Sequence, residues 1–272
     1  MSSREDEALA LAAVDALTGQ LALAPKPGLP DPRDLDARVT RKDQLALRWS
    51  AKALAPGLAA MAAAARRTGE PTPALRTELG AIGRSTEHSV ELAGGGHRGA
   101  LWALGLLVAA AALNPRAKAL DVAAAAKRIA SHPDKRAPRR PSRGSSVSAK
   151  YGAAGARGEA RAGFPHVKRA LGALATARSN GATEAEARLD ALLTVMSTLQ
   201  DTELLYTAGP HGLRHVQAGA REILEAGGTS TEAGTKALTT FDTDLHTRAW
   251  SPRGSAGLFA GALFLDSLPV TP

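Results

Sequence analysis

Alanine is the feature that most constrains the fold of this chain, because it accounts for 59 of the 272 residues whereas aromatic residues make up only 3%. Alanine has the highest helix propensity of the amino acids and a low preference for strands. Charged residues, 22% of the chain, alternate with apolar ones, and this pattern excludes wholesale disorder. The sequence therefore predicts an all-α fold without a significant sheet, and we expect residues 1–272 to form a single multi-helix bundle.

The apolar periodicity predicts a series of helices separated by breaks rich in proline and glycine. Two of these helices, 99–113 and 254–268, are apolar on nearly every face, which is typical of helices at the centre of a bundle. The other expected helices cover residues 5–23, 43–67 with a bend at Pro56, 74–92, 115–130, 156–161, 165–178, 183–199, 213–226 and 232–250.

Segment 132–148 interrupts this pattern with five basic residues and three prolines. It has no apolar period, so we expect a flexible basic loop within the bundle. The net charge of +8 suits a phosphate-rich partner such as a nucleotide, nucleic acid or anionic lipid. Because the loop contains no aromatic residue on which bases would stack, nucleic acid is not the favoured partner.

The chain contains no cysteine, which excludes disulfides, a thiolate nucleophile and metal sites with cysteine ligands. Its first residues are polar and acidic and contain no apolar signal core. The longest apolar run, 100–113, is shorter than the roughly 20 residues that a membrane-spanning helix needs. We therefore expect a cytoplasmic protein without a membrane partner.

Four glycine-containing stretches lie where predicted helices begin, and they are the candidate functional segments: Lys26–Asp31, Gly94–Gly99, Gly155–His166 and Ser251–Ala256. Glycine lets backbone N–H groups converge, and a helix N-terminus adds a partial positive charge, a combination that binds phosphate. Ordinary caps and turns have the same composition. The residues by themselves favour a helical protein that binds a phosphorylated ligand and specify no reaction.

Other polar residues give weaker signals. Asp201 and Glu203 lie beside Thr202 at the end of a predicted helix, a pattern typical of a solvated helix end. His166 and His211 are isolated histidines, which are more often surface or structural groups than ligands. No pair of histidines has a carboxylate at metal-ligand spacing.

Several blocks of the sequence carry a family resemblance. Pro25–Leu29 with Asp31 resembles the motif Pro-Lys-Pro-Gly-Leu-Val-Asp, and His97–Leu107 resembles Thr-His-Arg-Gly-Ala-(Ile/Leu)-x-Ala-Leu-Gly-Leu-Leu. Further blocks at 151–165, 201–202 and 251–266 follow in the same order. These are motifs of the triphosphoribosyl-dephospho-CoA synthases, which make the prosthetic-group precursor of citrate lyase and malonate decarboxylase. The resemblance runs nearly end to end, and the malonate decarboxylase branch is the most similar.

The resemblance implies a reaction in which ATP and dephospho-CoA give 2′-(5″-triphosphoribosyl)-dephospho-CoA and adenine. The ribose hydroxyl of dephospho-CoA attacks the anomeric carbon of ATP, which requires a base, an acid for the departing purine and stabilisation of an oxocarbenium-like centre. The triphosphate implies Mg²⁺ held by carboxylates. The expected partners are small-molecule nucleotides and proteins of the malonate decarboxylase pathway.

The resemblance also implies roles for residues within the matching blocks. Glu159 and His97 are the predicted catalytic residues, Glu159 as a base or metal ligand and His97 in contact with phosphate or purine. Asp31 and Asp201 are the predicted magnesium ligands. The predicted substrate and phosphate contacts are Lys26, Gly28, Gly95, Gly96, Arg98, Arg157, Ser251, Gly254 and Ser255.

The chain departs from the family motifs at positions where the family carries polar groups. Lys42 stands where the family has an acid, and its positive charge opposes metal binding there. Three functions remain open: a divergent synthase, a homologue repurposed for another nucleotide-dependent glycosyl transfer or acceptor, and a non-catalytic nucleotide-binding protein. The departures are Thr40, Lys42, Gln44, Tyr206, Thr207 and Gly257.

Overall fold

The computed structural model describes residues 2–33, 38–138 and 142–269, and it describes only the backbone of residues 38–44 and 143. Within these residues the regular elements are all helices, which confirms the predicted all-α fold. The helices are α1 (Arg4–Leu21), α2 (Arg38–Lys52), α3 (Ala55–Thr68), α4 (Pro73–Leu92), α5 (Arg98–Leu113), α6 (Ala119–Ser131), α7 (Arg143–Tyr151), α8 (Gly155–Arg161), α9 (Pro165–Ser179), α10 (Glu184–Met196), α11 (Thr202–Glu225), α12 (Glu232–Thr247) and α13 (Arg253–Asp266).

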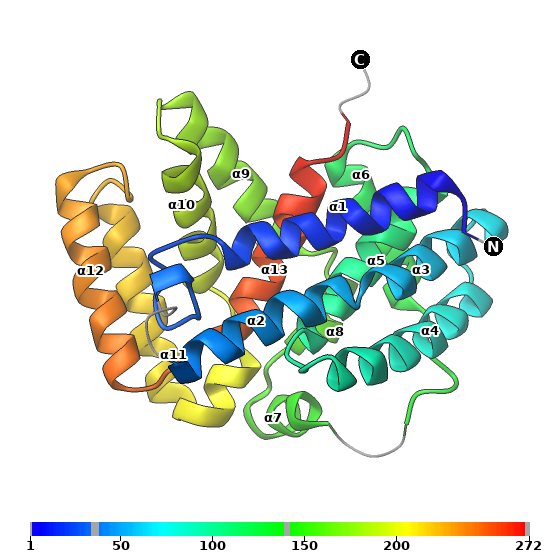
Figure 1. Ribbon diagram of the computed structural model, residues 1–272, viewed down its shortest axis with the longest axis horizontal. Coiled ribbons are helices and arrows are strands. Elements are labelled where there is room, and N and C mark those ends of the chain that lie inside the picture. Colours follow the sequence, from blue (N-terminus) through cyan, green and yellow to red (C-terminus); the bar gives the residue numbers. More distant parts are fainter. Residues whose placement is uncertain (1, 34–37, 139–141, 270–272) are drawn as a thin grey trace.

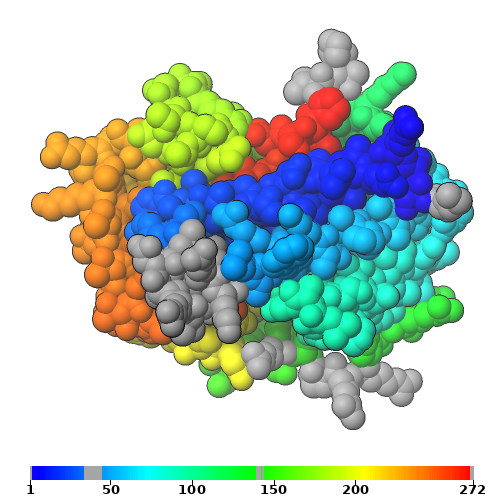
Figure 2. Space-filling view, viewed as in Figure 1, coloured from blue at the N-terminus to red at the C-terminus, as the bar shows by residue number. Residues whose placement is uncertain are grey.

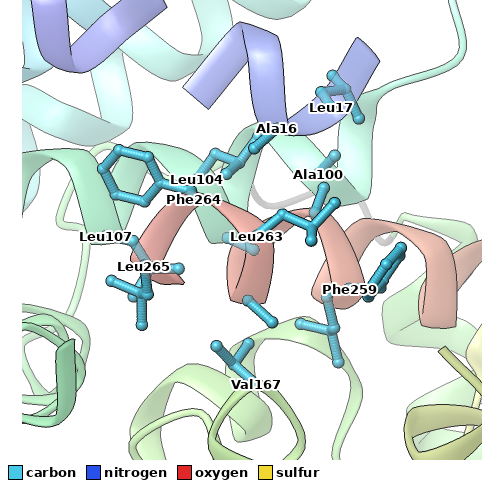
Figure 3. Packing of buried hydrophobic residues seen from close by; sticks show 14 of the residues in the cluster. Ala16, Leu17, Ala100, Leu104, Leu107, Val167, Phe259, Leu263, Phe264 and Leu265 are labelled. Atoms are coloured by element: carbon cyan, nitrogen blue, oxygen red, sulfur yellow. The ribbon is translucent and has the colours of Figure 1, made fainter. Parts of the chain in front are cut away.

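The two helices predicted to be central, α5 and α13, are central. Residues 255–265 of α13 are all buried, and α5 buries residues 100–112 except Trp102. Side chains of α13 pack against Leu17 of α1, Leu104 of α5 and Val167 of α9 (Figure 3). Gly257 and Gly261 lack side chains where α13 approaches α5 and α9 most closely, which helps the neighbouring helices to cover it.

The other helices surround this pair (Figure 1). Helix α1 crosses the front of the molecule, where it covers α3, α5 and α13 (Figure 2). The pairs α9–α10 and α11–α12 lie at one end of the molecule, and α3, α4 and α6 lie toward the other. A main cluster of buried hydrophobic residues includes members from α1 to α13 other than α7, and a small cluster of Val147, Ala153 and Leu205 joins α7 to α11.

Two predicted helix boundaries are wrong for reasons of local chemistry. The chain breaks at residues 53–54 rather than bending at Pro56, because Pro56 occupies the first turn of α3, where its missing N–H costs nothing. Helix α11 begins at Thr202 instead of residue 213. The helix is kinked at Gly209, which has φ 64° and ψ −169°, and at Pro210. Because glycine and proline usually end a helix, the sequence did not indicate the two turns before them.

The predicted flexible basic loop is also partly wrong. Its last residues form the start of α7, because Ser142 and Ser145 cap that helix reciprocally. Residues 139–141, with two of the basic side chains, lie outside the described residues. Across the described chain, no helix combines the length and the apolarity that crossing a membrane requires.

Candidate functional site

Asp201 joins the N-termini of two helices. Its Oδ1 accepts the backbone N–H groups of Glu203 at 3.0 Å and Leu204 at 3.3 Å, which makes it the N-cap of α11. Its Oδ2 accepts the backbone N–H of Ser255, in the first turn of α13, at 3.0 Å. A Cβ atom on Gly254 would lie 2.9 Å from the carboxylate, so glycine is needed for this approach. One carboxylate therefore neutralises the positive ends of two helices.

This use of Asp201 differs from the prediction of a solvated helix end and from that of a magnesium ligand. The residue is only 2% exposed, and burial raises the pKa of its carboxyl even though several backbone N–H groups oppose that shift. Both oxygens already accept hydrogen bonds from the protein. The geometry is that of a structural cap.

The first stretch lies against the residue that precedes the fourth. Gly28 adopts φ +64°, and a Cβ atom at this position would overlap the carbonyl oxygen of Trp250, the residue before Ser251. Only a glycine satisfies both requirements. The Oγ of Ser251 is shielded from solvent and has no hydrogen-bond partner among the described residues. This orphaned hydroxyl is consistent with the predicted substrate contact.

The second and third stretches reach the same region. A Cβ atom on Gly257 of α13 would lie 3.2 Å from the backbone nitrogen of Ala100, in the first turn of α5. A Cβ atom on Gly155, at the start of α8, would lie 3.6 Å from the Cγ2 of Thr202, which follows Asp201. Residues in or beside the four stretches therefore lie together where α5, α8, α11 and α13 begin.

Asp31 closes the first stretch into a loop. The side chain is fully buried and accepts the backbone N–H groups of Lys26 and Arg33, each at 2.9 Å. The guanidinium of Arg33 binds Asp31 at 2.5 Å and Asp242 of α12 at 2.8 Å. Burial acts to raise the pKa of Asp31, but the hydrogen bonds from Arg33 and Lys26 prevail and lower it. The carboxylate predicted to bind magnesium thus forms an ion pair that attaches this loop to α12.

Lys26, a predicted phosphate contact, lies in the interior. Its side chain is buried, and its Nζ donates to the Oε1 of Gln20 on α1 at 3.2 Å. The two other predicted basic contacts are at the surface: Arg98 forms an ion pair with Glu87 of α4, and Arg157 is exposed.

His97 is buried and is the N-cap residue of α5. Its Nε2 lies 2.7 Å from the carbonyl oxygen of Leu47, and because a carbonyl only accepts, Nε2 carries the proton. Burial lowers the pKa of His97, the nearby charge of Lys26 also lowers it, and the bond to Leu47 only partly compensates. The imidazole is therefore neutral at neutral pH, and its Nδ1 presents a lone pair. Gly95 and Gly96, which precede it, have φ of 74° and 108° and form the turn that brings His97 to this position.

Glu159 is paired with His166, a connection that was missed from the sequence. The buried carboxylate accepts the backbone N–H of His166 at 2.9 Å through Oε1 and the ring Nδ1 at 2.7 Å through Oε2. Phe164, the N-cap residue of α9, supplies no side-chain cap, so Glu159 performs that task from α8. With Nδ1 donating to Glu159, the basic nitrogen of a neutral His166 is Nε2.

The predicted magnesium site is not assembled by the described residues. Among them, no group of three or more acidic or histidine side chains surrounds a common point. Asp31 and Asp201 serve an ion pair and a helix cap, so these two residues do not fit a metal. Thr40, Lys42 and Gln44, three of the departures from the motifs, have side chains outside the described part.

The structure describes the side-chain environment of the other residues that depart from the family motifs. Gly257 packs against the backbone of Ala100, where a Cβ atom would make a tight contact at 3.2 Å. Tyr206 is 56% exposed on the first half of α11, and its neighbour Thr207 is exposed as well.

A cavity of about 590 Å³ lies elsewhere, between α11 and α12. None of the four stretches contributes to it, and Ile223, Phe241, His215 and Lys236 are among its lining residues. The predicted site residues lie in and around the four stretches where the helix N-termini meet, and not in this cavity.

Comparisons with known proteins agree with the resemblance in the motifs. A family model described as ATP:dephospho-CoA triphosphoribosyl transferase matches residues 6–271. A probable 2-(5''-triphosphoribosyl)-3'-dephosphocoenzyme-A synthase of Pseudomonas fluorescens is 47% identical over 267 residues, which cover 96% of this chain and 91% of that protein. The proteins of the same name from Pseudomonas aeruginosa (47% identical; 97% and 92% covered) and Azotobacter vinelandii (45%; 94% and 89%) are similar to it as well. No solved structure matches the chain.

Proposed function

Because this chain belongs to the family of ATP:dephospho-CoA triphosphoribosyl transferases, we propose that its catalytic centre lies where the four glycine-containing stretches converge. The chain is a transferase that moves the triphosphoribosyl group of ATP to dephospho-CoA. The observation that carries the location is the junction of α5, α8, α11 and α13, where Asp201 binds Ser255 and Gly257 packs against Ala100. Backbone N–H groups at helix starts and a net charge of +8 suit two polyanionic substrates.

The reaction forms one bond and breaks another at the same carbon. The 2′ oxygen of the dephospho-CoA ribose bonds to C1′ of the ATP ribose, and the bond from C1′ to the adenine nitrogen breaks. The hydroxyl loses a proton, and the departing adenine gains one. The protein must therefore provide a base beside the hydroxyl and exclude water, which would otherwise hydrolyse the same carbon.

We assign the base to the pair formed by His166 and Glu159. Glu159 holds the Nδ1 proton of His166, and the Nε2 of the ring then accepts the proton of the attacking hydroxyl. In this assignment Glu159 is a positioning residue rather than the base itself. Neutral His97, with a lone pair on Nδ1, accepts a hydrogen bond from the purine amino group.

The remaining predicted contacts serve binding. Arg157 and Arg98 interact with phosphate from the surface, and Ser251 offers its unpartnered hydroxyl. Magnesium that accompanies the triphosphate has no fitting ligand set among Asp31 and Asp201, so no step is assigned to it. We further propose that residues 1–272 form one domain, supported by the hydrophobic cluster that extends from α1 to α13, and that the product serves the malonate decarboxylase pathway, supported by the motif resemblance.

Chromatography of ATP incubated with dephospho-CoA, Mg²⁺ and the protein tests this function. We expect adenine only when both substrates are present. Adenine released with a different acceptor would support a repurposed transferase instead. Nucleotide binding by calorimetry without any adenine release would support a non-catalytic protein.

A further inference from the structure

Two arginines of α4 contact one buried carboxylate, and two arginines of α8 lie close to them. Asp134 lies in the segment between α6 and α7. Its Oδ2 accepts a hydrogen bond from the Nη1 of Arg84 at 2.6 Å, and the Nη1 of Arg76 lies 4.0 Å from the same oxygen. Both arginines belong to α4. Arg157 and Arg161 of α8 are close enough that their charges lower the pKa of Arg76. We call these four residues the arginine cluster.

Arg76 is the least solvated member of this cluster. Its side chain is 15% exposed and its Nη1 is shielded from solvent without a hydrogen-bond partner among the described residues. Its guanidinium lies 6.0 Å from the ring centre of Trp102 on α5. Burial lowers the pKa of Arg76, the charge of Asp134 opposes this, and three neighbouring arginines reinforce it. A buried guanidinium without full pairing is costly, so an anion that reached it would be bound favourably.

A purely structural role explains only part of the arrangement. Gly80 lets Asp134 approach α4 so closely that a Cβ atom there would overlap the carboxylate. Arg84 binds one oxygen of Asp134, and the backbone N–H of Arg136 binds the other at 2.9 Å. Asp134 is therefore satisfied without Arg76, Arg157 or Arg161. Arg161 donates from its Nε to the carbonyl oxygen of Ala130 at 3.4 Å, which attaches α8 to the end of α6. Anchoring of this segment gives no reason for the charges of Arg76 and Arg157.

The cluster is continuous with the catalytic centre proposed above. Arg157 lies two residues after Gly155, at the start of α8, and two residues before Glu159. Arg161 lies at the other end of the same short helix, which packs against α5 and α6. The cluster therefore includes a residue of the third of the four converging stretches.

We propose that the arginine cluster binds the triphosphate of ATP. This inference rests on the proposed function, since it gives one substrate group a place beside the centre. A triphosphate carries about four negative charges, roughly twice those of the diphosphate in dephospho-CoA, and it matches four guanidinium groups with one opposing carboxylate. Guanidinium forks bind phosphate oxygens in pairs, which lysine does not do. Asp134 holds Arg84 in position and does not touch the ligand.

Inorganic tripolyphosphate isolates the group in question from the purine and ribose. We expect calorimetry at fixed ionic strength to show that Arg157→Ala and Arg76→Gln each weaken its binding by about 10- to 100-fold, the effect of losing a charge-assisted hydrogen bond. The KM for ATP rises correspondingly, while the KM for dephospho-CoA stays unchanged. Arg116→Ala is the matched control, because Arg116 is an exposed arginine between α5 and α6. It leaves both constants unchanged.

Several outcomes overturn the proposal. Wild-type protein that does not bind tripolyphosphate, or an unchanged affinity in Arg157→Ala, removes it, and so does a loss confined to dephospho-CoA. If circular dichroism shows that Arg76→Gln does not fold, the tripolyphosphate affinity of Arg157→Ala, a variant at an exposed position, is the deciding measurement. Adenine release by the wild type is measured separately: its absence rejects the proposed function, whereas normal release with unaffected tripolyphosphate binding rejects only the cluster.

Discussion

The carboxylate of Asp201 and the backbone N–H of Ser255 are 3.0 Å apart, although 54 positions separate them in the sequence. Together with a longer bond of 3.4 Å from the Oγ of Ser255, this bond attaches the N-terminus of α11 to the central helix α13. A cap of this kind stabilises the folded protein through local hydrogen bonds. Because the carboxylate is buried, a substitution that removes these bonds lowers the free energy of unfolding strongly. The arrangement of the site therefore depends on a carboxylate that need not touch substrate.

Replacing Asp201 by Asn should destabilise the protein by about 2–4 kcal/mol, because the amide NH₂ would face backbone N–H groups that now find a carboxylate oxygen. Thermal or urea unfolding measures the effect. Asp15→Asn, at an exposed position of α1, is the control and should change stability by no more than about 0.5 kcal/mol. Equal stability of the Asp201 variant and the wild type would contradict the capping role.

The Asp31–Arg33 pair should make stability depend on pH in acid. Hydrogen bonds hold the pKa of Asp31 below its ordinary value of 3.8, so its stabilising contribution is present above about pH 4 and is lost as the pH falls through the lowered pKa. Asp31→Asn lacks this contribution and should be less stable by about 2 kcal/mol at pH 7. Urea unfolding between pH 2 and 7 should show that the difference narrows below pH 4. A difference that stayed constant down to pH 2 would be inconsistent with an ionised Asp31.

The apolar core was predictable because its determinants are local. Segments 99–113 and 254–268 lack a polar face, and helices of this type lie at the centre of a bundle. The ends of helices were less predictable. Gly209 and Pro210 break the pattern inside α11, and the Ser142–Ser145 capping box was concealed by neighbouring arginines and prolines.

The candidate site was predictable as segments and not as contacts. The motifs identified Glu159, but its partner His166 lies in the next helix and no spacing rule connects the two. The sequence did not distinguish Arg76 and Asp134 from other charged residues, because an arginine in an amphipathic helix is exposed unless a neighbouring element buries it. Burial of charge depends on which helices pack together, and that is a property of the whole fold.

Glu159→Gln should abolish most adenine release, with kcat lower by about 10²–10⁴-fold. Glutamine still offers an oxygen to one donor of His166, but it does not hold the Nδ1 proton as a carboxylate does. Nitrogen NMR of the imidazole reports whether the proton of His166 moves from Nδ1, which loss of packing alone would not cause. Glu225→Gln, at an exposed position of α11, is the control for the change of charge. Full activity of Glu159→Gln would remove this residue from the machinery.

His97 should act as a neutral group throughout the physiological range. Because burial lowers its pKa below 6.5, the ring stays mainly neutral between pH 8 and pH 7. His97→Gln should therefore raise the KM for ATP by about 10-fold, the effect of one hydrogen bond, by the same factor at every pH in that range. Initial rates of adenine release at several ATP concentrations measure this factor. A factor that changed between pH 8 and pH 7 would show that the imidazole gains a proton in this range.

Gly254 should tolerate no side chain, because a Cβ atom there would lie 2.9 Å from the carboxylate of Asp201. Gly254→Ala is expected to push the two helix ends apart and to destabilise the protein by about 1–3 kcal/mol, as overpacking does elsewhere. Gly172→Ala provides the matched control, since Gly172 is a helical glycine of α9 with no atom within 4 Å of the added methyl group. That variant should gain about 0.5–1 kcal/mol from higher helix propensity. If Gly254→Ala lowers and Gly172→Ala raises the free energy of unfolding, the loss at Gly254 comes from its close approach to Asp201 and not from helix propensity. If both substitutions raise the free energy of unfolding, the contact between Gly254 and Asp201 is less tight than in the structure.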